Sequence, residues 1–460
     1  MIVSSLFFRT GSAKEGGFSH EKEGNAQRGQ RASGKSASGR RTGEGDTPFF
    51  PSLMERLGAV SDPRHQSYIV YSSRVLLMTR ILSAIFYISS MRKTSEEFNS
   101  PIVIENIGCL CGEDLQELPY WETVNNYLKR VNPEELQKTV CALVKRLIRS
   151  RTFEDARIRG RDWHILIDGS GIVSSREELD GNYIFKVHHR GKPEEYTEYD
   201  YYALEAKLVL GNEIVVSVMT EFVENTDEES EKQDCERKAC QRLMKRLKET
   251  FPKLPICIGA DSLYACKTFF EACETRQWRY IVRFKEGGIP GVFQEYETLR
   301  KLGGNRRKGT DGKLSYWYDF VSGIDYEGHK LNCLEYAEDG KPYSFVFLTN
   351  LPLSHRNARQ TAFCGRQRWK IENQGFNAQK NHGFALGHLF SRNYRAMKNH
   401  YYLIQIGHMI AQIMDAWKSL WKDIRQSKEQ KHKRMLESWK THRLSECDLE
   451  TPSRFQIRLE

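Results

Sequence analysis

The order of apolar runs between residues 163 and 284 constrains the fold more than any other feature of this 460-residue chain. Three runs typical of strands come first, followed by a helical pattern, a strand, a second helix and a last strand. In chain order the segments are WHILID (163–168), YYALEAKLVL (201–210), EIVVSVMTEFV (213–223), a helix over about 235–249, PICIGAD (255–261), LYACKTFFEAC (263–273) and WRYIVRF (278–284). This order is that of an RNase H-like core, so we predict an α/β fold with a mixed sheet.

The segments that flank and interrupt this core differ in composition. Residues 48–155 show helical spacing, and Asn132-Pro133 before two glutamates predicts a helix start. Residues 286–350 are rich in Gly, Tyr and turn pairs, and a structureless loop of that length is rare in a compact domain. We predict an all-helical N-terminal domain (48–155), suited to DNA binding or to packing alone, and an RNase H-like catalytic domain (156–415) interrupted by a β-rich insertion (286–350).

The two ends of the chain are basic. Residues 1–47 are rich in Gly, Ser, Arg, Lys and Glu and cannot bury enough surface to offset the entropy of ordering. We expect a disordered arm there, or a stretch that is not translated, and a basic, helical tail over residues 416–460. The apolar stretch from Val75 to Met91 is shorter than a membrane span and contains Arg80, so we interpret it as a buried helix and expect no membrane partner.

Charge and cysteine content limit the partners and the compartment. The formal net charge of +10 favours a polyanionic partner, although it does not decide the matter alone. The eleven cysteines show neither paired CxxC motifs nor Cys/His zinc spacing. Reduced, mostly buried thiols in a cytoplasmic protein are therefore expected.

Three acids, Asp168, Asp261 and Glu372, form the candidate catalytic site. Asp168 with Gly169 can simply make a turn, and Asp261 can simply cap a helix. Glu372 can form an exposed ion pair with Arg368, one helical turn earlier. Together they are more specific, because the strands ending at the two aspartates are neighbours in this fold and a helix after the insertion can bring Glu372 over the same edge. Mg²⁺ prefers such oxygen ligands, and two ions about 4 Å apart support phosphoryl transfer.

The chain resembles DDE transposases of the IS4-like insertion-sequence group from about Asp62 to Gln412. The most specific motifs are WHILIDGS, KQDCERKACQRL, ADSLYACKTFFEAC, and RQRWKIENQGFN followed by KNHYYLIQI. The resemblance implies an RNase H-like core in which Asp168, Asp261 and Glu372 bind Mg²⁺, with Mn²⁺ able to substitute. It also implies a prokaryotic host and a cytoplasmic, nucleoid-associated protein.

The family carries a Tyr-x2-Arg-x3-Glu-x6-Lys signature around its last acid, and these positions share one helical face. Arg368 and Glu372 match the signature, so Arg368 is expected to contact phosphate. Gly365 stands at the Tyr position and Gln379 at the Lys position, and neither is assigned a role. A basic residue follows each of them, but one residue along an α-helix turns the side chain by about 100°, so we expect both to face away. These two residues are Arg366 and Lys380.

Other side chains are weaker candidates. Arg283 and Lys285 end a strand at the same sheet edge and are candidates for DNA contact, with a solvated strand end as the alternative. Trp317, in the insertion, can stack on an unpaired base, or it belongs to the core of a small sheet, which we favour. Glu236, at a helix start, is interpreted as a surface residue, with a place behind the acids as the alternative.

The resemblance implies a DNA transposase that cleaves a strand at the transposon end and transfers the freed 3′-OH into target DNA. The expected partners are double-stranded DNA, as terminal inverted repeats and as target, and a second copy of the chain in a homodimeric synaptic complex. Two alternatives are a catalytically inactive DNA-binding remnant, which the altered Gly365 and Gln379 positions favour, and an RNase H-like nuclease without strand transfer.

Overall fold

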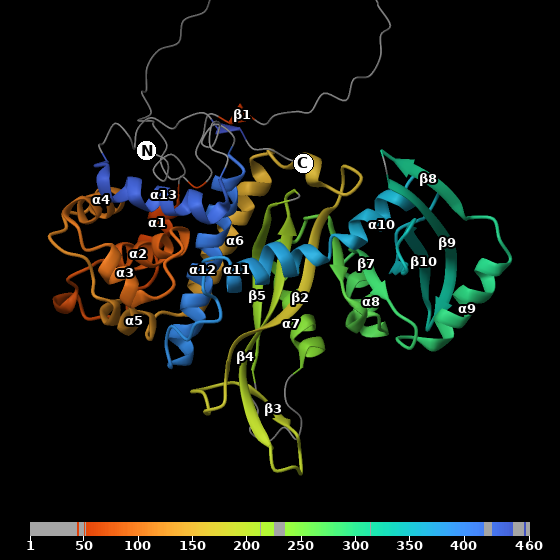
Figure 1. Cartoon of the computed structure of the whole chain (residues 1–460), viewed down its shortest axis with the longest axis horizontal. Helices are drawn as coiled ribbons and strands as arrows, with labels where there is room; N and C mark the ends of the chain where they lie inside the picture. The colour runs from red at the N-terminus through yellow and green to blue at the C-terminus, as the bar shows by residue number, and fades with distance from the viewer. Residues whose placement is uncertain are drawn as a thin grey trace, which may run out of the picture.

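The computed structural model (Figure 1) describes residue 50 and residues 52–211, 213–224, 235–312, 314–417 and 426–444. It also describes the backbone of a short antiparallel strand pair, β1 (Glu44–Gly45) and β12 (Phe455–Gln456). Apart from β1, the expected arm over residues 1–47 lies outside the described residues, as do parts of the expected tail. In the described part of that tail, residues 428–441 form helix α13 (Lys428–Thr441).

The N-terminal region consists of helices. They are α1 (Leu53–Gly58), α2 (Ser73–Ile85), α3 (Met91–Glu97), α4 (Pro101–Cys111), α5 (Trp121–Leu128) and α6 (Pro133–Arg149), with 3₁₀ turns η2 (Gln66–Tyr68) and η3 (Glu154–Ala156). Helix α6 starts as predicted, because the Asn132 side chain accepts a hydrogen bond from the Glu134 backbone N–H and Pro133 occupies the first turn. Helix α2 is buried along almost its whole length, as interpreted. Among the described residues, no helix combines the length and the apolar character that crossing a membrane requires.

A ten-stranded mixed sheet follows these helices. Its strands are β2 (Trp163–Ser175), β3 (Ile184–His188), β4 (Tyr196–Val209), β5 (Val215–Val223), β6 (Ile256–Ala260), β7 (Arg279–Phe284), β8 (Arg307–Asp311), β9 (Leu314–Tyr326), β10 (His329–Glu338) and β11 (Phe345–Thr349). Strand β2 pairs antiparallel with β4 and parallel with β6, while β6 pairs parallel with β7. The central order β5-β4-β2-β6-β7 is that of an RNase H-like core, which confirms the predicted fold class.

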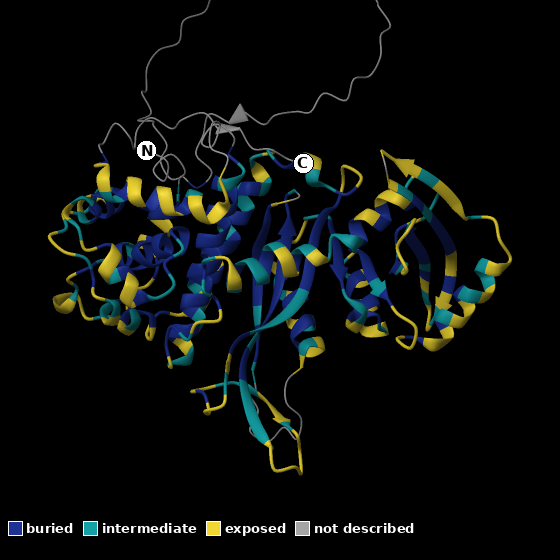
Figure 2. Cartoon of the chain, in the orientation of Figure 1, coloured by how far each residue is buried: buried dark blue, intermediate teal, exposed yellow. Residues whose placement is uncertain are grey.

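Helices cover both faces of the sheet (Figure 1). One face carries α7 (Glu236–Thr250) and α8 (Lys267–Thr275); the other carries α10 (Ala358–Arg366), the π-helical segment η5 (Ile371–Asn377), α11 (Ala378–Asn381) and α12 (Tyr394–Asp415). Side chains alternate along β2, so Ser170 contacts α11 whereas Gly169 faces α7. Helix α12 is buried along nearly its whole length and packs on both α2 and β5 (Figure 2). It therefore joins the helical region to the sheet.

The β-rich insertion extends the core sheet rather than forming a separate one. It opens with helix α9 (Pro290–Lys301) and continues through β8 to β11. Strand β11 pairs antiparallel with β7, from Val346 opposite Phe284 to Thr349 opposite Ile281. A second, smaller core lies between these strands and α10, and includes Phe347.

Candidate active site

Asp168 on β2 and Asp261, directly after β6, lie where the two central parallel strands part. The β2–β6 register ends with Leu166 opposite Gly259, and continuing it by two residues would place Asp168 opposite Asp261. The charge of Asp261 is close enough to raise the pKa of Asp168. The fold thus brings the first two predicted acids together, as neighbouring parallel strands require.

Strand β2 does not end at Asp168, contrary to the prediction. It continues to Ser175 because residues 169–175 keep pairing with β4, through an irregularity between Gly171 and Val173. The pairing with β6 stops before Asp168. The Asp168-Gly169 pair is therefore not a turn but the point at which β2 parts from one of its two neighbours.

Burial and nearby charges set the protonation of Asp168. Its side chain is 21% exposed, and Arg368 Nη1 donates to its Oδ2 at 3.1 Å. Burial raises the pKa of Asp168 to about 7, while Arg368 opposes the rise and Asp261 and Glu236 add to it. Two neighbouring carboxylates fit a divalent cation that binds oxygen, such as Mg²⁺.

Asp261 follows β6 directly and caps the 3₁₀ turn η4 (Ser262–Tyr264). Its Oδ1 accepts a hydrogen bond from the Leu263 backbone N–H at 2.8 Å. The ordinary explanation of Asp261 as a cap is therefore correct. A carboxylate has two oxygens with several lone pairs, so capping fixes the side chain and still leaves ligand capacity.

The crossing segment, residues 358–381, lies over β2 and carries Arg368 and Glu372. It consists of α10, a turn at residues 367–368, η5 and α11. Three contacts fix it to residues of β2 that point to the same face. They are His164 Nδ1 to Gln367 Oε1 (3.0 Å), Asp168 Oδ2 to Arg368 Nη1 (3.1 Å) and Ser170 Oγ to Lys380 Nζ (2.8 Å).

Lys380 faces the site, contrary to the prediction that it points away. That prediction assumed an α-helix, whereas residues 371–377 form a π-helix, in which each turn holds more residues. Lys380 therefore lies on the helical face that carries Arg368, although the signature places its Lys one position earlier, at residue 379. Gln379 is instead fully buried, and Arg366 points as expected away from the site, toward Glu338 of the insertion.

Glu372 lies in the first turn of η5, and its side chain is exposed. Its position in the chain, between Arg368 and Lys380, puts it on the stretch that crosses the aspartates. The three acids do not converge, however. Across the described ranges, no group of three or more Asp, Glu, His or Cys side chains is arranged to hold a metal ion.

Glu236 lies behind the aspartate pair, on the other face of β2. It is the first residue of α7, and its carboxylate accepts hydrogen bonds from Tyr202 Oη at 2.9 Å and Tyr264 Oη at 2.6 Å. A Cβ at Gly169 would lie 2.5 Å from Tyr202 Oη and 2.8 Å from Glu236 Oε2, so the glycine leaves room for this pair beside Asp168. The interpretation of Glu236 as a surface residue is therefore wrong, and the alternative place behind the acids is correct.

Besides Arg368, three further predicted DNA contacts lie in different settings. Arg283 donates to two backbone carbonyls at the start of β11, and burial lowers its pKa, an effect to which the nearby Arg368 charge adds. Lys285 is exposed directly after β7. Trp317 is half-buried on β9, and the Arg306 guanidinium covers its ring at 4.0 Å from the ring centre.

Two exposed aromatic side chains on the crossing segment did not emerge from the sequence as candidates. Trp369, next to Arg368, is 56% exposed, and Phe363 of α10 is 55% exposed. An exposed aromatic ring beside basic side chains is what stacking on a nucleic-acid base requires. In the sequence, Trp369 could have been found as a candidate because it directly follows Arg368 in the motif RQRWKIENQGFN.

Comparisons with known proteins complete the description. No curated protein matches the chain. Among solved structures the chain is similar to piggyBac transposase in a synaptic complex with hairpin DNA, at 12% identity over 85% of this chain and 78% of that one. The TM-score is 0.38, which is too low to say anything about the site. The transposase DDE-domain family matches residues 159–410, more than half of the chain, from just before β2 into α12. The chain therefore belongs to the transposase DDE-domain family.

Proposed function

We propose that this protein is a DNA transposase that cleaves a strand at the ends of its element and joins the freed 3′-OH to target DNA. The observation that carries the proposal is the closeness of Asp168 and Asp261 at the point where β2 and β6 part, with Arg368 bound to Asp168, in a chain of the transposase DDE-domain family. Paired carboxylates are suited to a divalent metal, and an arginine beside them is suited to a phosphate.

Asp168, Asp261 and Glu372 are the residues that we assign to Mg²⁺, with Mn²⁺ as a substitute. Bound metal ions would activate the attacking oxygen and stabilise the leaving one. The two aspartates are already close enough for the charge of Asp261 to raise the pKa of Asp168. The structure records no hydrogen bond or ion pair of the Glu372 carboxylate among the described residues, so this exposed side chain can turn toward them.

Arg368 is positioned to serve both the acids and the substrate. One of its nitrogens neutralises Asp168, and the planar guanidinium has further donors for a phosphate oxygen. Lys380 supplies a second positive charge above Ser170, further along the same face. Arg283 and Lys285 extend this positive edge along the end of β7.

Trp369 is proposed to stack on a base next to the cleavage site. Trp369→Ala is expected to slow single-turnover cleavage of a fully paired end by about tenfold, since base stacking on an aromatic ring contributes about 1–3 kcal/mol. An end whose last bases are already unpaired should lose less, because it needs less help to stay open. Trp369→Phe, which keeps a ring, is the control, and equal losses on both substrates would contradict the assignment. Trp317 is the weaker candidate, because Arg306 has to leave its ring first.

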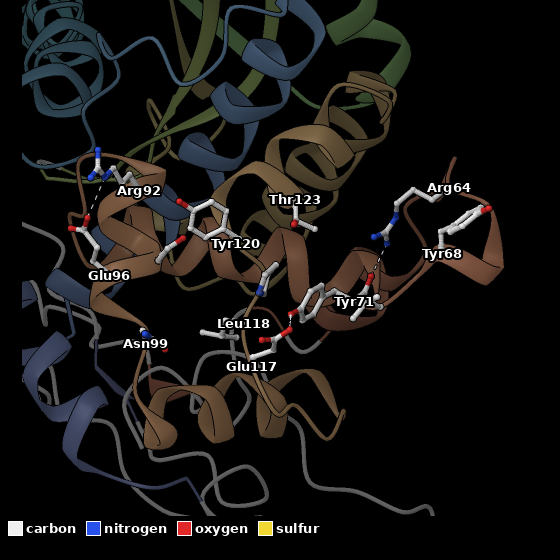
Figure 3. A pocket seen from close by; sticks show the side chains of 13 residues that line it. Arg64, Tyr68, Tyr71, Arg92, Glu96, Asn99, Glu117, Leu118, Tyr120 and Thr123 are labelled. Atoms are coloured by element: carbon white, nitrogen blue, oxygen red, sulfur yellow. Dashed lines mark hydrogen bonds and ion pairs between the residues drawn. The ribbon is translucent and has the colours of Figure 1, made fainter.

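The helical region over residues 48–155 is also proposed to bind DNA. A cavity of about 670 Å³ lies there (Figure 3), lined in part by Tyr68, Arg92 and Tyr120. Both tyrosines are exposed, and Arg92 is held in a surface ion pair with Glu96. Such side chains are suited to positioning contacts with a DNA backbone.

Because two ends must be joined, we further propose a homodimeric synaptic complex, in a cytoplasmic, nucleoid-associated protein of a prokaryote.

The test of the proposed function uses a supercoiled plasmid that carries the DNA flanking the gene on both sides. Incubated with the full chain and Mg²⁺, it is expected to be nicked at one fixed position on each side. A pre-cleaved end with a 3′-OH is then expected to join an unrelated plasmid. Cleavage without joining would establish the nuclease alternative, and DNA binding without cleavage in Mn²⁺ would establish the inactive remnant.

Gly365 and Gln379, which replace the Tyr and Lys of the signature, give little support to the alternative of an inactive DNA-binding remnant. Gly365 packs against Phe347, and a Cβ there would lie 2.6 Å from that ring, so the missing Tyr follows from how the insertion packs on α10. The second altered position, Gln379, is offset by Lys380, which the π-helix brings to the site. An active enzyme is therefore the better proposal.

The raised pKa of Asp168 leads us to expect that, without metal, the stability of the protein depends on pH. Its pKa is about 7 in the folded protein and 3.8 otherwise, so between those values the folded state holds a proton that the unfolded chain has lost. The resulting stabilisation is complete below the lower value and is lost as the pH rises through the upper one. In EDTA, the melting temperature should therefore fall between about pH 5 and pH 8, and fall less in Asp168→Asn, whose amide does not titrate. Parallel melting curves for the two proteins would contradict this.

A further inference from the structure

A charged pair lies fully buried beneath the crossing segment. Lys207 and Glu205, two residues apart on β4, expose none of their side chains, and Lys207 Nζ lies 3.5 Å from Glu205 Oε2. The register places Glu205 opposite Asp168 and Lys207 opposite Leu166 on β2. Opposite residues of an antiparallel pair point to the same face. The charged pair therefore stands beside the candidate catalytic acid, on the side that the crossing segment covers.

Glu205 is held by hydroxyl groups of β5 and α12. Ser217 Oγ donates to it at 2.6 Å, Tyr401 Oη donates at 2.8 Å, and the Thr220 hydroxyl donates as well. Three donors on fixed elements meet the hydrogen-bonding needs of this carboxylate. Because these hydroxyl groups bind Glu205, the Lys207 ammonium is able to contact the crossing segment as well.

Lys207 contacts the crossing segment both directly and through Gln405 of α12. Its Nζ donates to Gln405 Oε1 at 3.0 Å, and Gln379 Nε2 donates to the same oxygen at 2.6 Å. A Cβ at Gly375 would lie 3.1 Å from both Cδ and Cε of Lys207, so the π-helix packs on the lysine stem. Lys207 Nζ also lies 5.3 Å from the centre of the Phe376 ring, within the range of cation–π attraction.

These contacts fall on the stretch that orients the site. Gly375 and Phe376 belong to η5, the π-helical turn that begins with Ile371 and Glu372. Gln379 directly precedes Lys380, which reaches Ser170 only because of the π-helical register. By contacting Gly375, Phe376 and Gln379, Lys207 and Gln405 therefore also hold the neighbouring Glu372 and Lys380 in place.

Stability alone does not account for a buried pair of this kind. Removing two charges from water offsets most of their attraction, and well-packed apolar replacements are often equally stable. The best-attested use of a buried ionic group is to select one arrangement over a close competitor. A π-helical turn has such a competitor, because the α-helix is the far commoner form.

We propose that Lys207 is a positioning residue, which together with Gln405 and Gln379 holds residues 371–377 in the π-helical register that carries Glu372 on the segment over β2 and brings Lys380 to Ser170. In an α-helical register Lys380 would turn away by about 100°. The inference rests on the proposed function, which assigns Glu372 to the metal and Lys380 to the phosphate.

The decisive variant is Lys207→Met/Glu205→Gln, which keeps both side-chain sizes and leaves no unpaired charge. It is expected to fold with a melting temperature close to that of the unmodified protein. Hydrogen exchange of the amides in residues 371–377 should become faster, because the turn has lost its anchor. The affinity of the protein for Mn²⁺, followed by electron paramagnetic resonance, should fall about tenfold or more, as it does when groups behind metal ligands are changed.

Asn399→Ala is the matched control. Asn399 is also fully buried, on α12, but its amide donates to the Leu128 and Val131 carbonyls at 2.8 and 2.9 Å, toward α5. This variant should lose stability while exchange in residues 371–377 and Mn²⁺ affinity stay unchanged. If both variants change these two readouts alike, the role of Lys207 is merely structural and the inference is overturned.

Unchanged exchange and unchanged Mn²⁺ affinity in the folded double variant would also overturn the inference. Should that variant fail to fold, Gly375→Ala answers the same question, because its Cβ presses on the lysine stem and leaves both charges in place. It should weaken Mn²⁺ binding by several-fold, and unchanged binding would contradict the inference. If the unmodified chain never cuts DNA, the proposed function fails, while hydrogen exchange still decides whether Lys207 fixes the turn.

Discussion

Asp168→Ala is expected to abolish strand cleavage and strand transfer while DNA-end binding stays within about twofold of the unmodified protein. The loss of rate should reach about 10³-fold or more, because metal ligation supplies several kcal/mol of transition-state stabilisation and each 1.4 kcal/mol is tenfold. Binding should persist, since contacts with the DNA backbone come from basic side chains elsewhere. Cleavage of a supercoiled donor and a gel-shift assay with the same end measure the two effects.

The control for this prediction is Asp325→Ala. Asp325 is an exposed acid of the insertion, paired with Lys330 at 3.0 Å, and surface pairs of this kind contribute little. It should cut at the unmodified rate. An Asp168→Ala protein that still nicks the donor in Mg²⁺ would remove Asp168 from the site and, with it, the proposed mechanism.

Glu372→Gln is expected to have an effect of similar size, and its comparison with Glu236→Gln decides which acid completes the site. Glu372 is exposed on the crossing segment, whereas Glu236 is already bound by two tyrosine hydroxyls on the far face of β2. We expect Glu372→Gln to lower cleavage in Mg²⁺ by about 10³-fold. Glu236→Gln should cost about tenfold, which is typical of groups that support metal ligands without touching the ion.

The reverse order of losses would assign the third ligand to Glu236. Titration with Mg²⁺ gives an independent reading of the same question. Loss of a true ligand should leave cleavage low at any Mg²⁺ concentration, whereas loss of a supporting charge should be overcome by more Mg²⁺. The result also decides whether Glu372 moves toward Asp168 and Asp261 when it functions.

The fold was predictable wherever the local pattern carries the information. The strand and helix order from Trp163 to Phe284 follows from the switch between strand and helix periodicity, and the parallel neighbours β2 and β6 follow from that order. The length of β2 beyond Asp168 was not predictable, because Gly169, Ser170 and Gly171 resemble a turn and only the partner strand shows otherwise. The pairing of β11 with β7 was equally hidden, since no local signal names a partner strand.

The placement of the two aspartates on neighbouring strands was predictable, but their surroundings were not. The aspartates could be placed because chain order fixes their strands. Lys380 could not, because nothing in the local sequence announces a π-helical turn, and that turn rests on Lys207, far away in the chain. Glu236 could not be placed either, since its tyrosine partners come from β4 and η4.

The ladder between β11 and β7 has a mechanical consequence. Because the insertion is hydrogen-bonded into the sheet that holds Asp261, it cannot swing over the DNA on a hinge of its own. From β6 to β9, which carries Trp317, is four strand spacings of about 4.8 Å, or roughly 19 Å across the sheet. In the proposed transposase, DNA bound by the insertion would therefore lie at a fixed distance from Asp261. Any fitting between the insertion and the site would have to come from bending of the DNA.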